Sequence, residues 1–406
     1  MRCFLKKILY IARAGLPIDA AGIRMEQIGN LFERLDYKIH YICNMRVNKA
    51  VENSGYQLIE ADDYLNSYEK HYCNGKKIYS YLPKIKNSKY NSAKEIIEIF
   101  TAANVYKRVV DYCEKEKPNI IILYNDAYSL TKKLTTYCKK NNIKIIADIT
   151  EWYEKRKDAK IGERSINYLT DRRIQSLDFK LDGAIVISKF FEEYYKKRNL
   201  KCIWIPPLME IKCQNCIKKF NYDNFENIIN FVYAGAPGSK DNISNFVEAI
   251  VKVNKLNVKC RLDIIGVDES YFNYMNISNL KEYGVYAHGR LTHEKTIEYV
   301  YHADFGILFR ENKRYAKAGF STKFSECMSL GVPMICNSVG GTDVMIENGK
   351  NGILISDYEV STLVDTINHI IKFDISKIEM MKYSALEYAD NYLNIDKYIE
   401  SIENII

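Results

Sequence analysis

Short, continuously apolar segments alternate with amphipathic ones along most of this chain. Apolar runs of this kind are typical of strands that are buried on both faces, and the longer stretches between them have helical spacing. After the first such run, Ile28, Leu31, Phe32 and Leu35 follow the i, i+3, i+4, i+7 pattern of an amphipathic helix. Strands that alternate with helices form a parallel sheet covered on both faces. The sequence therefore predicts an α/β fold.

The alternation occurs in two series. The first series predicts strands at 8–12, 39–43, 120–123, 143–149, 184–187 and 203–205, and a helix over 93–115. The second series predicts strands at 228–233, 261–265, 285–287, 304–309, 334–336 and 353–355. Its predicted helices lie at 243–256, 269–282, 293–302, 321–331, 359–372, 376–392 and 396–405. We interpret 44–92 only as loops and short elements.

Pro206-Pro207 ends the first series, and a polar, lysine-rich stretch separates it from the second. The length of 406 residues is ample for two domains. We expect a doubly wound domain at 1–208, a linker at 209–228, a second doubly wound domain at 229–390 and a final helix at 391–406. Folds of this kind bind ligands at the carboxyl ends of their strands, so two such edges should face a central cleft.

The composition is that of a globular protein, with 47% hydrophobic and 27% charged residues. No apolar run reaches the length of a bilayer span, and the first residues lack the apolar core of a signal peptide. We therefore expect a cytoplasmic protein. The eleven cysteines are scattered, and the lone pair Cys213 and Cys216 has no second pair nearby, so we expect no metal.

The net charge of +8 permits contact with anionic partners. Residues 76–94 are rich in lysine and tyrosine. This segment is either a solvated loop or a contact with the inner face of the plasma membrane. No nucleic-acid-binding motif accompanies it, so nucleic acid is not an expected partner.

The stretch from Lys317 to Asn337 places a loop and a helix after the strand at 304–309. Ser321 or Thr322 should begin the helix, because either hydroxyl can accept a hydrogen bond from the first turn. Gly331 should end it in the left-handed conformation. The free N–H groups at the start of such a helix, together with its dipole, favour an anion, most often phosphate.

Glu326 lies too far into this helix to cap it. One interpretation is a solvated glutamate that pairs with Lys323. The other is a carboxylate that accepts hydrogen bonds from sugar hydroxyls beside a bound phosphate.

Three further predicted strands of the second series end in glycine or in a basic residue. Gly235 permits close approach of a ligand, and Lys240 can reach phosphate oxygens, although it does not form a P-loop motif. Gly266 ends the next strand, and His288 and Arg290 follow the one after it. An ordinary loop lysine and an exposed arginine are the alternatives. Together these turns favour a nucleotide diphosphate that carries a sugar.

These motifs make the chain resemble the retaining GT-B glycosyltransferases of glycosyltransferase family 4, especially bacterial enzymes of capsule, O-antigen and exopolysaccharide assembly. Gly235 and Lys240 match the family's glycine and lysine turn. Glu326 matches the second glutamate of its paired-glutamate motif, which binds the ribose hydroxyls. Ala318 stands where the first glutamate would be. The run Ser321-Thr322-Lys323 before Glu326 is similar to a subset that also lacks it.

The resemblance also covers the first half of the chain. It implies a glycine-bearing loop similar to the segment with Gly15, Gly22 and Arg24. It also implies polar residues facing the acceptor after a central strand, where Asp148 and Glu151 stand. Asp148 can alternatively be a helix-capping or turn residue. The adjacent Trp152 is either a packing residue or a platform for a sugar. The last helix of the family usually crosses back onto the first domain.

The resemblance implies transfer of a sugar, with retention, from a nucleotide-diphosphate sugar to a hydroxyl of a lipid-linked glycan. It also implies that no metal and no cofactor is needed, since Lys240 and Arg290 would stabilise the leaving diphosphate. Two alternatives remain. One is a catalytically silent nucleotide-sugar-binding partner subunit, which Ala318 suggests. The other is a GT-B-shaped 2-epimerase, for which His288 is a candidate residue.

Overall fold

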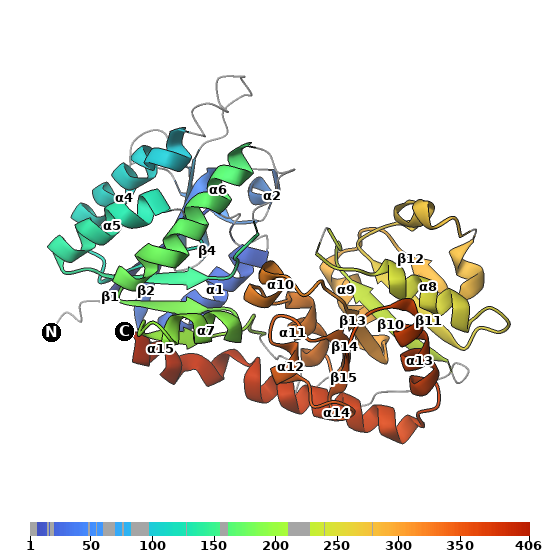
Figure 1. Ribbon diagram of the computed structural model, residues 1–406. Helices are drawn as coiled ribbons and strands as arrows, with labels where there is room; N and C mark the ends of the chain where they lie inside the picture. The colour runs from blue at the N-terminus through green and yellow to red at the C-terminus, as the bar shows by residue number, and fades with distance from the viewer. Residues whose placement is uncertain are drawn as a thin grey trace. The chain divides into compact units, whose positions relative to one another are not determined.

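The computed structural model describes residues 6–13, 16, 20–47, 49–53, 55–59, 70–74, 77–82, 97–126, 128–154, 161–209, 228–238, 240–277 and 279–406. The chain forms two compact units. One unit comprises Met1–Pro206 with Ile395–Ile406, and the other comprises Pro207–Asn394. Each unit contains one sheet flanked by helices (Figure 1). The predicted α/β class, with two doubly wound sheets, is confirmed.

In the described part of the first unit, nine strands form one sheet in the order β3-β4-β5-β2-β1-β6-β7-β8-β9. The strands are β1 (Lys6–Ala12), β2 (Tyr37–Arg46), β3 (Gln57–Ile59), β4 (Lys70–Asn74), β5 (Lys77–Leu82), β6 (Ile120–Tyr124), β7 (Lys144–Ile149), β8 (Gly183–Val186) and β9 (Cys202–Trp204). The helices are α1 (Ala20–Glu33), α2 (Lys49–Glu52), α4 (Ala103–Glu116), α5 (Tyr128–Asn141), α6 (Ile161–Arg172), the π-helix η1 (Arg173–Leu177), the 3-10 helix η2 (Asp178–Lys180) and α7 (Lys189–Lys196).

A row of tyrosines crosses the centre of this sheet. Tyr10, Tyr41 and Tyr79 are neighbours in register on three parallel strands, and their rings are stacked. A Cβ on Gly29 of α1 would lie 1.9 Å from the Tyr41 hydroxyl oxygen. Glycine is therefore needed at this point of the helix for the tyrosine to fit beneath it.

Strands β3, β4 and β5 lie in the segment that the sequence predicts only as loops and short elements. β3 and β4 pair antiparallel with their neighbours, and β5 joins the parallel part of the sheet beside β2. The strands of this segment are rich in tyrosine, lysine and other polar residues rather than continuously apolar. The pairing of β5 with β2, and of β4 and β3 in turn beyond it, rather than local pattern, decides that they are strands.

Among its described residues, the second unit has a six-stranded parallel sheet in the order β12-β11-β10-β13-β14-β15. The strands are β10 (Ile229–Ala234), β11 (Cys260–Ile265), β12 (Val285–Ala287), β13 (Phe305–Leu308), β14 (Met334–Asn337) and β15 (Gly352–Ile355). The helices are α8 (Ser244–Val253), the 3-10 helices η3 (Glu269–Met275) and η4 (Leu280–Tyr283), α9 (His293–His302), α10 (Arg314–Ala318), α11 (Thr322–Ser329), α12 (Thr342–Met345), α13 (Val360–Ile370) and α14 (Ile375–Tyr392).

The strand order of the second unit reverses between β10 and β13. In this doubly wound order the first and fourth strands are neighbours, and the loops after them diverge to opposite faces of the sheet. Phe231 and Phe305 on these two strands are fully buried, and Phe246 of α8 packs against Phe231. The core therefore fixes the two strand ends at the switch point, which is where ligands of such folds bind.

Two predicted elements of the second unit differ from the structure. The helix predicted over 269–282 is replaced by η3 and η4, because Asn276 and Asn279 between them adopt positive φ. The short helix α10 forms where the sequence predicts a loop. The predicted helix after it is confirmed as α11, and Gly331 beyond its end adopts the left-handed conformation.

The chain ends on the first unit. Helix α14 belongs to the second unit, and the 3-10 helix η5 (Ile395–Tyr398) and α15 (Ile399–Ile405) belong to the first. Helix α15 contacts α1 and β9, and Ile405 packs so closely on Gly183 that a Cβ there would lie 2.9 Å from Ile405 Cγ1. The break between the units falls between Pro206 and Pro207. Most of the expected linker, residues 210–227, lies outside the described residues.

Candidate functional site

Helix α11 begins at the switch-point edge of the second unit with a buried, unpartnered hydroxyl. Ser321 occupies the predicted cap position, but its side chain makes no capping hydrogen bond. It is only 6% exposed, and its Oγ has no hydrogen-bond partner among the described residues. The predicted capping bond is therefore wrong. The hydroxyl and the first N–H groups of the helix are left available to an anion.

The Asp241 carboxylate connects three elements at this edge of the sheet. Its Oδ1 accepts a hydrogen bond from Arg310 Nε at 2.6 Å. Its Oδ2 accepts from Lys323 Nζ at 2.9 Å and from the Tyr233 hydroxyl at 2.7 Å. Asp241 and Arg310 also form an isolated backbone bridge. One carboxylate thus connects the ends of β10 and β13 to the first turn of α11.

The two cations of this cluster determine the protonation state of Asp241. Burial acts to raise the pKa of Asp241, but Lys323 and Arg310 outweigh it and lower that pKa below its usual value. The carboxylate is therefore ionised at neutral pH. Two cations share one anion, so the cluster keeps an excess positive charge at the switch point.

The structure gives Gly235 a role within the protein itself, beside the approach of a ligand that the sequence suggests. Its φ is +119°, and a Cβ would lie 2.6 Å from Lys323 Cε. The side chain of Lys323 therefore occupies this space on its way to Asp241. At Gly266, with φ +113°, a Cβ would meet the carbonyl carbon of Gly235 at 2.5 Å. Packing and backbone conformation within the protein therefore give a reason for both glycines.

Glu326 does not pair with Lys323, which binds Asp241 instead. Burial raises the pKa of Glu326 above its usual value, whereas His293 and Lys323 act to lower it. Among the described residues, its carboxylate makes no hydrogen bond and no ion pair. A half-buried carboxylate without a donor is costly, and hydroxyl donors from a ligand would reduce that cost.

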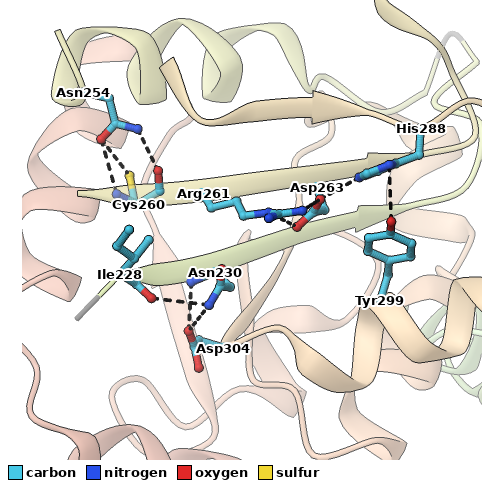
Figure 2. A network of polar contacts seen from close by, with 9 residues as sticks. All are labelled: Ile228, Asn230, Asn254, Cys260, Arg261, Asp263, His288, Tyr299 and Asp304. Carbon is cyan, nitrogen blue, oxygen red and sulfur yellow. Dashed lines mark hydrogen bonds and ion pairs between the residues drawn. The ribbon is translucent and has the colours of Figure 1, made fainter. Parts of the chain in front are cut away.

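His288 is held by a carboxylate of the neighbouring strand (Figure 2). Its Nε2 lies 2.6 Å from Asp263 Oδ1, and its Nδ1 lies 3.5 Å from the Tyr299 hydroxyl. Arg261 donates two hydrogen bonds of 2.8 Å to the same Asp263 carboxylate. This network fixes the imidazole at the end of β12. Arg290, two residues on, is exposed and forms no ion pair within the described part of the chain.

Lys240 lies between Gly235 and Asp241 on the same turn, and it is half-buried. Its backbone N–H points to the Pro237 carbonyl at 3.4 Å. Thr322 is the first residue of α11, and Lys317 is an exposed residue of α10. Of the cations predicted for this site, Lys323 is therefore the one that the structure places in the Asp241 cluster.

The predicted residues of the first unit form a buried ion pair. Arg24 donates to Asp148 Oδ1 from Nε at 3.1 Å and from a terminal nitrogen at 2.8 Å, and Tyr10 donates to Oδ2 at 2.5 Å. Arg24 also donates to the Ile205 carbonyl at 2.9 Å. Asp148 has no exposed surface. Both carboxylate oxygens are occupied, so the predicted capping or turn role is replaced by a buried pair.

The other predicted residues of this unit have separate environments. Glu151 is half-buried and accepts a hydrogen bond of 2.6 Å from the Tyr153 hydroxyl. Trp152 donates to Asp171 at 2.8 Å and stacks on Phe191, so it is a packing residue.

The predicted N-terminal loop is in part helical. Gly22 and Arg24 lie within α1, which begins at Ala20, and both are buried there. Gly15 lies outside the described residues, and so do Cys213 and Cys216. Of the segment 76–94, the structure describes only 77–82, which form β5.

Sequence reasoning missed Asp241 and Arg310. Each lies in the loop that follows an apolar strand of the second unit, and a charged residue in such a loop is the signal that could have identified them. What the sequence could not indicate is that the two side chains meet, since 69 residues separate them.

Neither a metal cluster nor a membrane span is found in the described ranges. No three His, Cys, Asp or Glu side chains there are grouped so that they could hold a metal ion. Likewise, no described helix combines the length and the apolar character that crossing a bilayer requires.

Comparison with known proteins agrees with the fold. Residues 217–387 match the family described as "Glycosyl transferases group 1". The chain is 26% identical over 204 residues, 48% of its length, to an uncharacterized glycosyltransferase of Methanocaldococcus jannaschii. The matched region spans about half, 51%, of that curated relative.

Two solved structures have the same architecture over nearly the whole chain. Sucrose-phosphate synthase from Thermosynechococcus elongatus has a TM-score of 0.67 at 15% identity, and the match covers 98% of both chains. HepE from Anabaena, in complex with UDP and glucose, has a TM-score of 0.62 at 14% identity, again over 98% of both chains. The chain therefore has the GT-B fold, and its residues 217–387 match the glycosyl transferases group 1 family.

Proposed function

We propose that this protein transfers a sugar from a nucleotide-diphosphate sugar to a hydroxyl group of a glycan acceptor, with retention of configuration. The observation that carries the proposal is the start of α11. There the unpartnered hydroxyl of Ser321 lies at the free N–H groups of a helix, and Lys323 supplies positive charge beside them. This combination suits a diphosphate.

The donor would bind along the carboxyl edge of the second unit's sheet. Its diphosphate would lie at the first turn of α11, including Thr322, within reach of Lys240 on the neighbouring turn. Glu326 would accept hydrogen bonds from the ribose hydroxyls. This role is supported by the fact that its half-buried carboxylate accepts no hydrogen bond from any described residue. His288, Gly266 and Arg290 would line the same edge at the ends of β11 and β12.

The residues of this site would act mainly on the leaving group. As the bond between the sugar and the diphosphate breaks, negative charge develops on the departing phosphate oxygens. Lys240 and Lys323 would stabilise that charge, and Arg290 is a further candidate. The acceptor hydroxyl would lose its proton to a departing phosphate oxygen as its own oxygen bonds to the sugar. The resemblance to retaining enzymes supports this order of events.

We propose that the acceptor binds to the first unit. Glu151 is the candidate for orienting its hydroxyl, and Asp148 would position Arg24 rather than touch the acceptor. We propose a lipid-linked glycan of surface polysaccharide assembly, met at the inner face of the plasma membrane. The support is the resemblance to bacterial capsule and O-antigen enzymes, together with the basic segment 76–94.

The test measures binding first and turnover second. Thermal unfolding of the full chain is followed with UDP, GDP, ADP and their glucose or mannose conjugates, starting with UDP, since the solved structure of HepE contains it. Saturation at about 100 times the dissociation constant stabilises a protein by roughly 2.7 kcal/mol, which is a shift of several degrees. The expected result is a shift with one nucleotide class, followed by consumption of that donor when a lipid-linked glycan is added. The absence of a shift with all of these nucleotides would contradict the proposal.

One observation favours a second candidate, a silent nucleotide-sugar-binding subunit. Ala318 stands where most of the family has its first glutamate, and it has no exposed surface. A silent subunit would bind one donor as above yet release no nucleoside diphosphate with any acceptor. Donor consumption therefore separates the two candidates.

A further inference from the structure

Arg310 is the cation of the switch point to which the proposed function gives no role. Its main chain is fixed by Asn337 at the end of β14, whose side chain accepts from the Arg310 N–H at 3.0 Å and donates to its carbonyl at 2.8 Å. Its side chain is fixed by Asp241, which accepts from Nε at 2.6 Å. Both the backbone and one edge of the guanidinium are therefore held in place.

The other edge of the guanidinium is unused. The two terminal nitrogens of Arg310 make no hydrogen bond to any other residue that the structure describes, although only 12% of the side chain is exposed. A guanidinium carries five donors in a planar fork, and Asp241 engages one of them. The remaining donors suit an anion that presents two oxygens.

Asp241 cannot itself receive an anion. Its two oxygens accept from Arg310 after β13, from Lys323 in α11 and from Tyr233 in β10. Its effect on a ligand is therefore indirect, through the cations that it holds. The negative charge of Asp241 weakens the binding of an anion nearby. Its position, however, directs Arg310 and Lys323 to one place.

We propose that Arg310 binds the diphosphate of the nucleotide donor through the free edge of its guanidinium, and that Asp241 is the residue that positions it. The inference rests on the proposed function. It adds one binding residue and one positioning residue to that site. A carboxylate on the donor sugar is the other anion with two suitable oxygens, and the experiment separates it from the diphosphate.

The experiment measures dissociation constants of the full chain for UDP, GDP, ADP and UDP-glucuronate by calorimetry. Arg310→Gln should bind the preferred nucleoside diphosphate at least tenfold more weakly than the wild type. The dissociation constant of Arg310→Lys should lie between those of the wild type and Arg310→Gln, because lysine keeps the positive charge but lacks the planar fork of donors. Lys252→Gln is the matched control for loss of one positive charge. Lys252 is an exposed residue of α8 paired with Glu248, and its replacement should leave binding unchanged.

Asp241→Asn separates position from charge. Removal of a negative charge beside an anion site should strengthen binding if charge alone matters. We expect weaker binding, by fivefold or more, because Arg310 and Lys323 lose the group that aligns them. Unfolding of each variant without ligand checks that it is folded. If Asp241→Asn does not fold, Asp241→Glu replaces it, since the longer carboxylate keeps the charge and shifts the alignment.

The possible results lead to different conclusions. Unchanged binding in Arg310→Gln overturns the role of Arg310, and unchanged or tighter binding in Asp241→Asn overturns the role of Asp241. A loss confined to UDP-glucuronate overturns the assignment to the diphosphate in favour of a sugar carboxylate. If the wild-type chain binds none of the nucleotides, the proposed function itself fails. Wild-type binding with an unaffected Arg310→Gln refutes only this inference.

Discussion

Lys323 and Gly235 share one space: a Cβ on Gly235 would lie 2.6 Å from Lys323 Cε. The glycine at the end of β10 therefore allows the lysine of α11 to cross the turn and reach Asp241, and the Lys323 ammonium lies 5.2 Å from the Tyr233 ring centre on the way. Two motifs that are 88 residues apart are thus parts of one arrangement.

Replacement of Gly235 by alanine should disturb Lys323 directly. The new Cβ would have to displace Lys323, and the φ of +119° is unfavourable for alanine. Overpacking of this kind costs about 1–3 kcal/mol of unfolding free energy. We expect Gly235→Ala and Lys323→Ala to be non-additive, with the double variant more stable than the sum predicts, as measured by urea unfolding. Additivity within about 0.5 kcal/mol would show that the two positions do not interact.

Lys240→Ala should reduce turnover and leave the fold intact. The lysine stands on the turn where the diphosphate is proposed to bind, and a hydrogen bond to a charged group contributes about 1.5–3 kcal/mol. The rate should therefore fall by about tenfold to a hundredfold or more. Donor consumption measures the rate, and thermal unfolding without ligand checks the fold. Wild-type turnover would remove Lys240 from the site.

Glu326→Gln should make the free protein more stable while it weakens donor binding. Because burial raises the folded-state pKa of Glu326, the folded state binds this proton more tightly than the unfolded state. That carboxyl then favours folding below its unfolded pKa and loses the contribution as the pH rises through the folded pKa. At pH 7 glutamine removes this penalty. Unfolding scans at pH 7, with and without nucleotide, should show a higher midpoint and a smaller ligand shift. A lower midpoint without ligand would mean that the carboxylate has a stabilising partner.

Asp241 should contribute stability with the opposite dependence on pH. Its folded-state pKa is lowered, so its contribution is present above the unfolded pKa of about 3.9 and is lost as the pH falls through the folded value. Asp241→Asn should therefore be less stable than the wild type at pH 7, and the difference should shrink as the pH falls below about 4. Urea unfolding at several pH values tests this. A difference that stays constant with pH would exclude the ion pairs as its cause.

Arg24→Met should destabilise the first unit strongly. The variant would leave Asp148 buried with only Tyr10 as a donor, and breaking a buried ion pair costs about 3–5 kcal/mol. Arg34→Met is the matched control, because Arg34 pairs with Asp396 at the surface and such pairs contribute about 0–1 kcal/mol. Adding Asp148→Asn should restore part of the stability lost in Arg24→Met. Equal effects of the Arg24 and Arg34 substitutions would argue against a buried pair.

Much of the fold follows from local pattern. The continuously apolar runs and the helical periodicity place the parallel strands of both sheets other than β5, and most helices of the second unit. The end of α11 before Gly331 follows from the glycine at that position, whereas α11 begins after Ser321 without the capping bond on which that prediction rested. The antiparallel strands β3 and β4 and the 3-10 helices in place of 269–282 do not, because their local sequence is compatible with several conformations.

Local sequence was enough to predict the fold class and to propose the sheet edge of the candidate site, because strand ends and helix starts depend on residues close in the chain. Which charges meet was decided by the tertiary structure alone. It pairs Lys323 with Asp241 rather than with Glu326, recruits Arg310 and buries Asp148 against Arg24. The reason is physical: a buried charge takes the partner that lies nearest in space, and that distance depends on how the strands are ordered in the sheet rather than on how the residues are spaced in the chain.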